Sequence, residues 1–560
     1  MKTMLTAVSA VGLLGAAMVP AAAAGTGQGD TSTRTATTAQ TATGATDSAD
    51  TYTPPAIRWG TCDDPRLVAA GADCGMLTVP MDYANPTGRT IQIALSRVKH
   101  SSPAKDYQGI ALVNPGGPGG SGYSLSRLGQ WIPKNAGARY DWIGFDPRGV
   151  GRSVPALECD NTYFGYDRPN YIPTTRKLEQ TWLTKAADYA ARCDAAGGEL
   201  LEHVKTIDTV RDMESIRKAL GQKKINYYGF SYGTYLGQVY STKFPARVGR
   251  MVWDGVVDPR GVWYQANLAQ DVAFDRNIDI YFRWLARHDD TYHLGTSGDV
   301  VRMKWYQMRD KLDASPALGK IGPDEWTDAF LSAGYYVYGW AEIGQAYSAA
   351  ITKDDWQPML DLYHGSNGEP GVDSDNNYAM YLATQCTDVQ WPPSWATWRT
   401  DNWRTHAKAP FETWANAWYN APCLTWGAKA PKYPAVSVSG EYVPPVLLIA
   451  ETNDAATPYP GALEVRRRYP RSVLIEGVGG TTHSGSLSGI ACTDNRIADY
   501  LLTGELPQRQ AGAHSDVQCR PVPKPTPEPT TTSLSAAQSS TASHRAELTQ
   551  ILQRARTPRG

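Results

Sequence analysis

The 560-residue sequence has little of several features that mark common protein classes. Charged residues make up only 19% and the net charge is −1, so nothing indicates nucleic acid or an anionic membrane surface as a partner. The sequence contains no CxxC motif and no cluster of Cys and His, and we therefore predict no metal and no cofactor. After residue 24 no apolar run is long enough to span a bilayer, so we expect no stable membrane association.

Eight cysteines are present, and an even number in an exported chain favours disulfide bonds. Pairing each cysteine with its neighbour in the sequence selects one of about 105 possible arrangements. The pairs predicted in this way are Cys62–Cys74, Cys159–Cys193, Cys386–Cys423 and Cys492–Cys519.

The two ends of the chain differ in composition from the rest. Lys2 precedes an apolar stretch over residues 5–19 and a small-residue cleavage site, which predicts a signal peptide over residues 1–24 and a secreted, extracellular protein. An uncleaved membrane anchor is the alternative. Residues 25–54 and 521–560 have few bulky apolar side chains, so we expect a disordered leader or pro-segment and a disordered tail.

Between these ends, short apolar runs alternate with helical patterns. This alternation predicts a mostly parallel sheet with helices on both faces. From about residue 261 to 440 the alternation stops and Trp and Tyr become frequent, so we expect a helical lid inserted between two parts of the core, residues 55–260 and 441–520. The predicted strands are 77–80, 91–98, 109–114, 140–146, a run ending at 230, 250–254, 446–450 and 472–476, and the predicted core helices are 175–196, 206–220 and 494–502.

The motif Gly229-Phe230-Ser231-Tyr232-Gly233 lies between a predicted strand and a predicted helix. This pattern and setting are typical of a nucleophile elbow, a sharp turn in which a Cβ at either glycine would clash with its neighbours. The alternative is a Gly-rich connection that carries an ordinary surface serine. We favour Ser231 as a nucleophile because both flanking elements are present.

A serine nucleophile needs a base that takes its proton and an acid that orients the base, and here both should follow the serine, acid first. His483 comes directly after the predicted strand 472–476 and is our candidate base. His514 lies beyond the last predicted helix, and His544 lies in the tail.

Asp454 is our candidate acid, because it follows the predicted strand 446–450 and the next loop carries the histidine. Asp254, at the end of an earlier strand, is the main rival. Asn453 and Glu451 are weaker rivals from the same loop as Asp454.

Residues 115–122 form a Gly-rich loop after a predicted buried strand. The loop matches the dinucleotide-binding pattern Gly-x-Gly-x-x-Gly, with Asp146 at a suitable distance, but Pro118 interrupts that pattern. We interpret the loop as part of an oxyanion hole, in which the backbone N–H groups of Gly117 and Tyr232 bind the developing negative charge.

Four stretches together resemble a known family: Asn-Pro-Gly-Gly-Pro-Gly-Gly-Ser-Gly at 114–122, Gly-Phe-Asp-Pro-Arg-Gly-Val-Gly-Arg-Ser at 144–153, Gly-Phe-Ser-Tyr-Gly-Thr-Tyr-Leu-Gly at 229–237 and Asp-Ala-Ala-Thr-Pro-Tyr at 454–459. They are similar to secreted tripeptidyl aminopeptidases, α/β-hydrolase serine exopeptidases related to prolyl aminopeptidases. The likeness covers about residues 57–520. It implies an α/β-hydrolase fold, the triad Ser231, Asp454 and His483, and release of tripeptides from free N-termini. Members usually have Gly after the histidine, whereas this chain has Ser484.

An aminopeptidase of this kind must bind the ammonium group of its substrate at a fixed depth. Three extended residues span roughly 10 Å, so a carboxylate should lie about that far from Ser231. Our candidate is Asp388, which a disulfide through Cys386 would hold; a solvated lid aspartate is the alternative. Relatives often carry an acid at the position of Gln385, so the amine site of this chain could differ. The aromatic side chains that could line a pocket for proline are Trp340, Trp391 and Tyr336.

Two other functions remain open at this point. An esterase or lipase would use the same triad without an amine-binding acid, and a catalytically silent binding protein would keep only the fold. We expect a monomer that acts on peptides with a free N-terminus.

Overall fold

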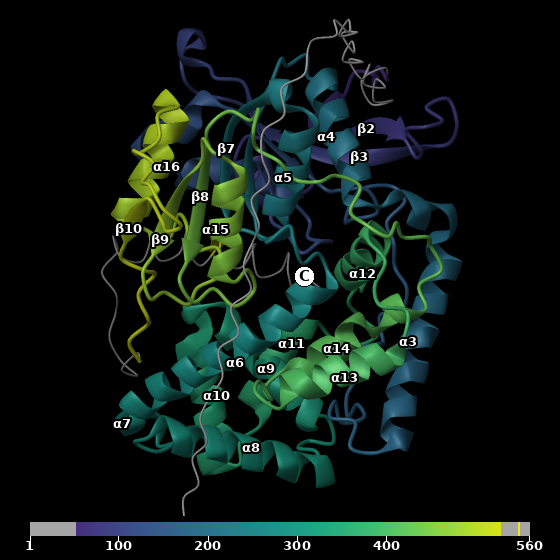
Figure 1. The fold of residues 1–560 in the computed structure, drawn as a ribbon, viewed down its shortest axis with the longest axis vertical. Coiled ribbons are helices and arrows are strands. Elements are labelled where there is room, and N and C mark those ends of the chain that lie inside the picture. The colour runs from purple at the N-terminus through teal and green to yellow at the C-terminus, as the bar shows by residue number, and fades with distance from the viewer. Residues whose placement is uncertain (1–51, 528–546, 549–560) are drawn as a thin grey trace, which may run out of the picture. The chain divides into compact units, whose positions relative to one another are not determined.

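The computed structural model describes residues 52–527 and 547–548; the predicted signal peptide and most of the predicted leader and tail lie outside these residues. A ten-stranded sheet in the order β1-β2-β3-β5-β4-β6-β7-β8-β9-β10 forms the core (Figure 1). Neighbours from β1 to β5 in this order are antiparallel, and neighbours from β5 to β10 are parallel. The strands are β1 (Arg58–Thr61), β2 (Asp73–Pro80), β3 (Thr90–Val98), β4 (Ile110–Asn114), β5 (Asp141–Phe145), β6 (Ile225–Phe230), β7 (Val248–Asp254), β8 (Val446–Glu451), β9 (Val473–Gly477) and β10 (Val517–Cys519).

Helices cover both faces of this sheet. Every residue of β4, β6 and β8 is buried, as expected for central parallel strands. Successive side chains of β6 point to opposite faces: Tyr227 packs in a cluster with α4, α5 and α15, and Tyr228 packs in a second cluster with α16. The helices of the core and its loops are α2 (Pro65–Ala69), α3 (Arg176–Gly197), α4 (Thr206–Ala219), α5 (Tyr232–Lys243), α15 (Tyr459–Arg468) and α16 (Ala491–Thr503), with 3-10 turns η1 (Ala104–Asp106), η2 (Tyr123–Trp131), η3 (Pro133–Arg139), η4 (Gly198–His203) and η5 (Pro245–Arg247).

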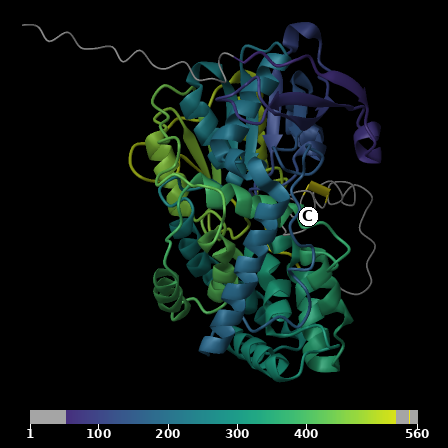
Figure 2. The ribbon, with the colours of Figure 1, turned by 90° about the vertical axis from the view of Figure 1, so that its right-hand side faces the viewer.

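The segment between β7 and β8 is mainly helical and lies at one end of the sheet in both views (Figures 1 and 2). We call it the lid. Its elements are α6 (Tyr264–Arg287), α7 (Asp289–Tyr292), α8 (Gly298–Ala314), α9 (Pro323–Tyr335), η6 (Val337–Gly339), α10 (Trp340–Lys353), α11 (Gln357–Asn367), α12 (Asn376–Asp388), α13 (Trp395–His406), α14 (Thr413–Asn420) and η7 (Ala421–Leu424).

The lid has its own hydrophobic core, and large indoles fill it. Trp305, Trp326 and Trp340 are fully buried there, and the indole N–H of Trp340 donates to the carbonyl of Ala333 at 2.9 Å. An indole can fill space between helices while its N–H binds a backbone carbonyl, as in Trp340, whereas the N–H groups of Trp305 and Trp326 have no hydrogen-bond partner among the described residues.

All four predicted disulfide bonds are present. Each predicted strand is present as well, within a few residues of its expected bounds, whereas β1, β10 and α15 were not predicted.

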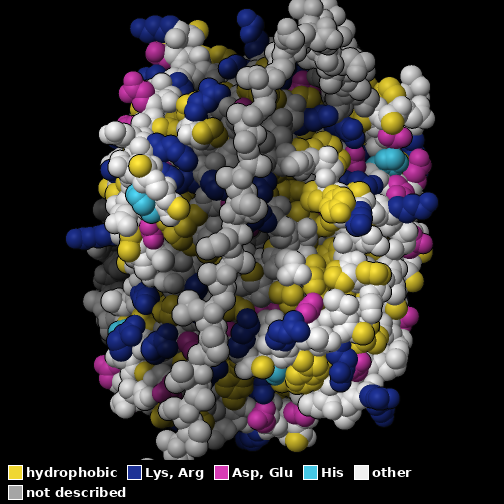
Figure 3. All heavy atoms as spheres, viewed as in Figure 1, with side chains coloured by type: hydrophobic (Ala, Val, Ile, Leu, Met, Phe, Trp, Pro, Cys, Tyr) yellow, Lys and Arg dark blue, Asp and Glu magenta, His cyan; other side chains and the backbone are white. Residues whose placement is uncertain are grey.

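Among the helices of the described chain, none has the length and apolar character needed to cross a bilayer. On the face shown in Figure 3, basic and acidic side chains lie intermingled. The domain boundaries drawn from the sequence stay a prediction.

Candidate active site

Ser231 lies in the turn between β6 and α5, with the left-handed backbone angles φ 56° and ψ −126°. This strained conformation is fixed by its neighbours, since the N–H of Ser231 donates to the carbonyl of Asp254 at 2.9 Å. A Cβ added to Gly229 would lie 2.5 Å from the carbonyl oxygen of Gly233. The elbow therefore requires glycine where the sequence has it, and the serine is placed at the carboxyl end of a central strand.

His483 and Asp454 form a buried pair beside this turn. The Nδ1 atom of the histidine lies 2.7 and 2.9 Å from the two carboxylate oxygens, and both side chains are fully buried. Asp454 also accepts from the backbone N–H and the hydroxyl of Thr457, at 2.9 and 2.8 Å. A carboxylate at Nδ1 places the proton on that nitrogen, which leaves Nε2 as the basic atom of the ring.

The serine turn and the histidine loop meet at the same two residues. Asp254 receives the N–H of Ser231, and a Cβ on the next residue, Gly255, would lie 2.7 Å from Cε1 of His483. This close approach is possible because Gly255 has no side chain, and its φ of +71° also favours glycine.

The Gly-rich loop, residues 115–122, also packs against the elbow. Gly116 has φ +102°, and a Cβ there would lie 2.6 Å from the carbonyl oxygen of Phe230 and 2.7 Å from Cβ of Ser231. The next residue, Gly117, lines the same cavity as Ser231 and Tyr232. The two residues predicted to supply the oxyanion donors thus line the same cavity as the serine.

The rival acids have other partners. Asp254 accepts from the N–H of Ser486 at 2.8 Å, and Glu451 accepts from the N–H groups of Thr482 and Val522. The ring of His514 contacts the carbonyl of Ser515 at 2.8 Å, and His544 lies outside the described residues. The structure therefore pairs the ring of His483 with the carboxylate of Asp454, while the catalytic roles stay predictions.

The lid holds the loops that carry the acid and the histidine. The side-chain amide of Asn277 in α6 donates to the carbonyls of Asn453 at 2.9 Å and of Gly334 at 3.0 Å, and the N–H of His483 donates to the carbonyl of Tyr335 at 2.8 Å. Sequence reasoning missed Asn277, because one polar residue in an amphipathic helix carries no signal of what it will contact.

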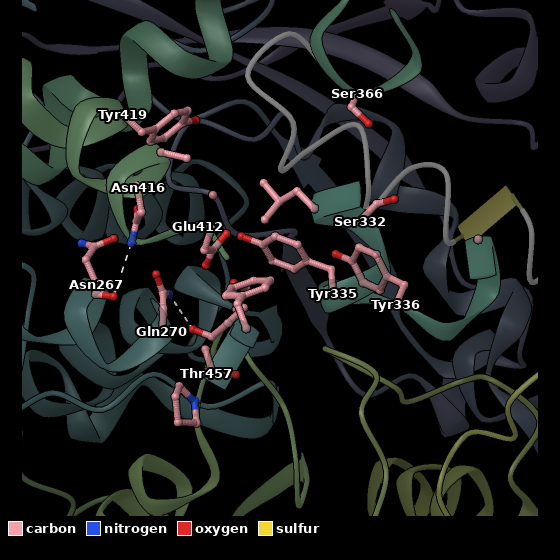
Figure 4. A pocket seen from close by; sticks show the side chains of 18 of the residues that line it. Asn267, Gln270, Ser332, Tyr335, Tyr336, Ser366, Glu412, Asn416, Tyr419 and Thr457 are labelled. Atoms are coloured by element: carbon pink, nitrogen blue, oxygen red, sulfur yellow. Dashed lines mark hydrogen bonds between the residues drawn. The ribbon is translucent and has the colours of Figure 1, made fainter. Parts of the chain in front are cut away.

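A cavity of about 1490 Å³ lies between the core and the lid and reaches Ser231. Its lining includes many lid side chains, among them Asn267, Gln270, Tyr335, Glu412 and Asn416 (Figure 4). Tyr336 also lines it, but Trp340 and Trp391 are not part of the lining and pack in hydrophobic clusters. Of the three aromatics suggested for a proline pocket, only Tyr336 is placed to serve there.

Asp388 lies outside the lining of this cavity. Its buried carboxylate accepts from the N–H and hydroxyl of Thr206, at 2.6 and 2.5 Å, and from the indole of Trp263 at 3.1 Å. Burial raises the pKa of Asp388 to about 6, and these donors limit the shift. The arrangement argues against Asp388 as the amine-binding acid, because its oxygens already have partners and do not face the substrate space.

Unlike Asp388, Glu412 both lines the cavity and has a carboxyl group without a hydrogen-bond partner among the described residues. Its side chain is 6% exposed and lines the cavity, and no hydrogen bond of the described residues reaches its carboxylate. Burial, together with the nearby acids Asp271, Asp328 and Asp275, raises the pKa of Glu412 well above its ordinary value. Sequence reasoning missed Glu412, since the clustering of these acids depends on how the lid helices pack.

Two arginines pair with members of this acid cluster, Arg168 with Asp328 and Arg302 with Asp275, the latter at 4.0 Å. Arg168 is buried and forms ion pairs with Glu325 and Asp328, both at 2.7 Å. Asp271 accepts from the amide of Asn416 at 2.7 Å, and burial raises its pKa to about 8. Neither Glu412 nor Asp271 forms an ion pair among the described residues, so a bound cation would be stabilised beside Glu412.

Comparison with known proteins agrees with this geometry. The family model described as alpha/beta hydrolase fold matches residues 112–487. A tripeptidyl aminopeptidase of Streptomyces coelicolor is 40% identical over 475 residues, which cover 83% of this chain and 86% of that protein. Serine protease Hip1 of Mycobacterium tuberculosis is 30% identical over 481 residues, covering 80% and 89%, and carboxylesterase B of the same species is 29% identical over 463 residues, covering 78% and 85%. The chain therefore belongs to the α/β-hydrolase family, in the group that contains the tripeptidyl aminopeptidases.

Proposed function

We propose that this protein is a secreted serine exopeptidase that releases tripeptides from the free N-terminus of peptides. The observation that carries the proposal is a buried acid in the same cavity as the elbow serine, Glu412, whose carboxyl group has no ion-pair or hydrogen-bond partner among the described residues. The relatives named above support the peptidase reaction. The four disulfide bonds support export, because such bonds persist in oxidising compartments.

The proposed reaction assigns one role to each of the three side chains. Ser231 Oγ attacks the carbonyl carbon after the third residue of the substrate and passes its proton to Nε2 of His483. The N–H groups of Gly117 and Tyr232 bind the oxyanion, and the histidine then gives its proton to the leaving amine as the C–N bond breaks. Water, deprotonated by His483, releases the tripeptide from the acyl-enzyme, while Asp454 stabilises the imidazolium in both halves.

Recognition of the N-terminus falls to Glu412. A substrate ammonium group brings a positive charge and three donors to a carboxylate that has no hydrogen-bond partner among the described residues. Blocking the amine by acetylation removes both the charge and two donors, and leaves Glu412 buried opposite a neutral amide. The enzyme should therefore distinguish free from blocked N-termini.

Two measurements test this function. A tripeptide p-nitroanilide with a free amine should be hydrolysed, and its N-acetylated form should be hydrolysed far more slowly. Mass spectrometry of the products from an unblocked peptide should show tripeptides released in sequence. Equal turnover of the free and blocked substrates, or products of other lengths, would refute the exopeptidase function.

An esterase is the second candidate, because a relative at 29% identity is named carboxylesterase B. An esterase of this fold would hydrolyse short acyl p-nitrophenyl esters without regard to a free amine. We therefore expect any activity on such esters to be insensitive to loss of the Glu412 charge, whereas peptide activity is sensitive.

A further inference from the structure

The segment that follows β10 packs against the rest of the protein. Residues 520–527, which we call the C-terminal strap, continue from the core towards the lid, although the sequence had suggested disorder from residue 521. Val522 is 5% exposed and packs in the hydrophobic cluster of the lid, and the indole N–H of Trp284 in α6 donates to the carbonyl of Pro525 at 3.1 Å. The strap also lines the cavity that contains Ser231.

One carboxylate joins the strap to the loop that carries the histidine. Glu451, the last residue of β8, accepts the N–H of Val522 on Oε1 at 2.7 Å and the N–H of Thr482 on Oε2 at 2.6 Å. The side chain is 5% exposed, and the loop approaches it closely, because a Cβ on Gly485 would lie 3.3 Å from Oε1. Thr482 immediately precedes His483, so the carboxylate fixes the backbone at the catalytic ring.

The other side of the histidine is held by the lid. The N–H of His483 itself donates to the carbonyl of Tyr335, at the end of α9. Two successive N–H groups of the loop thus bind two different parts of the protein, the end of β8 and the lid. The strap contacts both of these parts, through Val522 and Pro525.

We propose that Glu451 is a positioning residue that couples the C-terminal strap to the loop that carries His483. Each of the two carboxyl oxygens accepts one N–H group, whereas the amide of glutamine keeps one acceptor oxygen and replaces the other with an NH2 donor. If either bond is lost, a buried N–H is left without its partner and the loop can shift. A shift of 1 Å in a catalytic group can lower the rate by about a hundredfold, even when the substrate site is intact.

The first experiment compares two glutamates at neighbouring strand ends. Glu451→Gln keeps the size of the side chain but turns an NH2 group towards one of the two N–H donors. Glu476→Gln is the matched control: Glu476 is 8% exposed and accepts from the hydroxyls of Thr452, Tyr459 and Ser515, none of which belongs to the histidine loop. We expect Glu451→Gln to lower kcat roughly 10- to 100-fold with KM changed less than about twofold. Glu476→Gln should keep kcat.

The second experiment tests the strap itself. Val522→Pro removes the N–H that Glu451 accepts, and it suits the site because Val522 stands before Pro523 and is already restricted to extended backbone angles. Val522→Ala keeps the N–H and removes most of the apolar contact. We expect kcat to fall in Val522→Pro and to stay near wild type in Val522→Ala, with little further loss when Val522→Pro is combined with Glu451→Gln.

The outcomes separate coupling from a simple loss of stability. Melting temperatures and the rate of Ser231 labelling by a fluorophosphonate are measured for all variants, since labelling depends on His483 but not on peptide binding. Loss of kcat and labelling in Glu451→Gln and Val522→Pro, at melting temperatures like those of their controls, supports the proposal. Unchanged kcat in either variant, or equal loss in variant and control, overturns it. The inference rests on the proposed function, which fails separately if the wild-type enzyme is labelled but releases no tripeptide.

Discussion

Replacing Glu412 by glutamine tests whether a negative charge in the cavity selects free N-termini. Glutamine has nearly the same shape, so the cavity keeps its form, but it cannot carry the charge that an ammonium group needs. Truncating one partner of a buried charge pair costs about 2–5 kcal/mol. We therefore expect kcat/KM for a tripeptide p-nitroanilide with a free amine to fall about 30- to 4,000-fold, since each 1.4 kcal/mol is a factor of ten.

The dependence on pH gives a second, sharper signature. Burial and the surrounding acids Asp271, Asp328 and Asp275 hold the pKa of Glu412 well above its ordinary value, so in the empty enzyme the side chain keeps its proton at pH values where a free glutamate would lose it. Binding an ammonium group must then release that proton. For the free-amine substrate kcat/KM should rise with pH until the substrate amine, whose ordinary pKa is about 7.7–8.0, loses its charge.

In Glu412→Gln the part of the pH dependence that comes from proton release on binding disappears, since glutamine has no proton to release. The N-acetylated substrate serves as the internal comparison, because its weak hydrolysis should change little on the same substitution. Asp361→Asn is the matched control variant, since Asp361 also lines the cavity but is exposed. An equal loss for free and acetylated substrates, or an equal loss in Asp361→Asn, would refute an ammonium site at Glu412.

Three further predictions concern the triad, the oxyanion loop and the buried acids. Asp454→Asn should lower kcat by about 10⁴-fold, because the amide stabilises the wrong tautomer of His483. Stopped assays on the free-amine substrate measure kcat, and a melting curve checks that the variant is folded. A loss of kcat below tenfold would exclude Asp454 as the orienting acid. Gly116→Ala should abolish fluorophosphonate labelling, since its Cβ would meet the elbow at 2.6–2.7 Å; labelling at the wild-type rate would contradict the packing described here. Burial raises the pKa of Glu451 to about 8, above its ordinary 4.5, so the folded state keeps a proton that the unfolded state loses. The free energy of unfolding should therefore fall by up to about 3–5 kcal/mol between pH 5 and pH 8 through this group, and urea titrations should show a smaller fall in Glu451→Gln.

The parts of the site that the sequence predicted depend on short, local signals. The elbow is recognised from five consecutive residues because the glycines are required within the turn itself. Asp454 and His483 were found because each follows an apolar strand directly, and parallel strands place such loops at one edge of a sheet. The disulfide pairs were correct because each joins cysteines at most 37 residues apart, so each closes a short segment of the chain.

The parts that sequence reasoning missed depend on contacts between distant segments. Asp388 follows Cys386, and this proximity to a disulfide suggested a fixed carboxylate, but the direction of the side chain depends on Thr206, 182 residues away. Glu412 stands out only when Asp271 and Asp328 are seen near it. In the same way, the ion pair of Arg168 depends on Glu325, which lies 157 residues further along the chain. No pattern within one helix encodes such neighbours.

The lid decides between a peptidase and an esterase more strongly than the triad does. The same serine, histidine and aspartate serve both reactions, so their geometry alone favours neither. Burying a carboxylate without a partner is costly, and an enzyme that binds only neutral acyl groups gains nothing from that cost. In this protein Glu412 is buried beside other acids and forms no ion pair among the described residues, and the buried Arg168 already holds Asp328 and Glu325. A substrate that brings its own positive charge stabilises the ionised form of Glu412 each time it binds, and the free N-terminus of a peptide carries that charge.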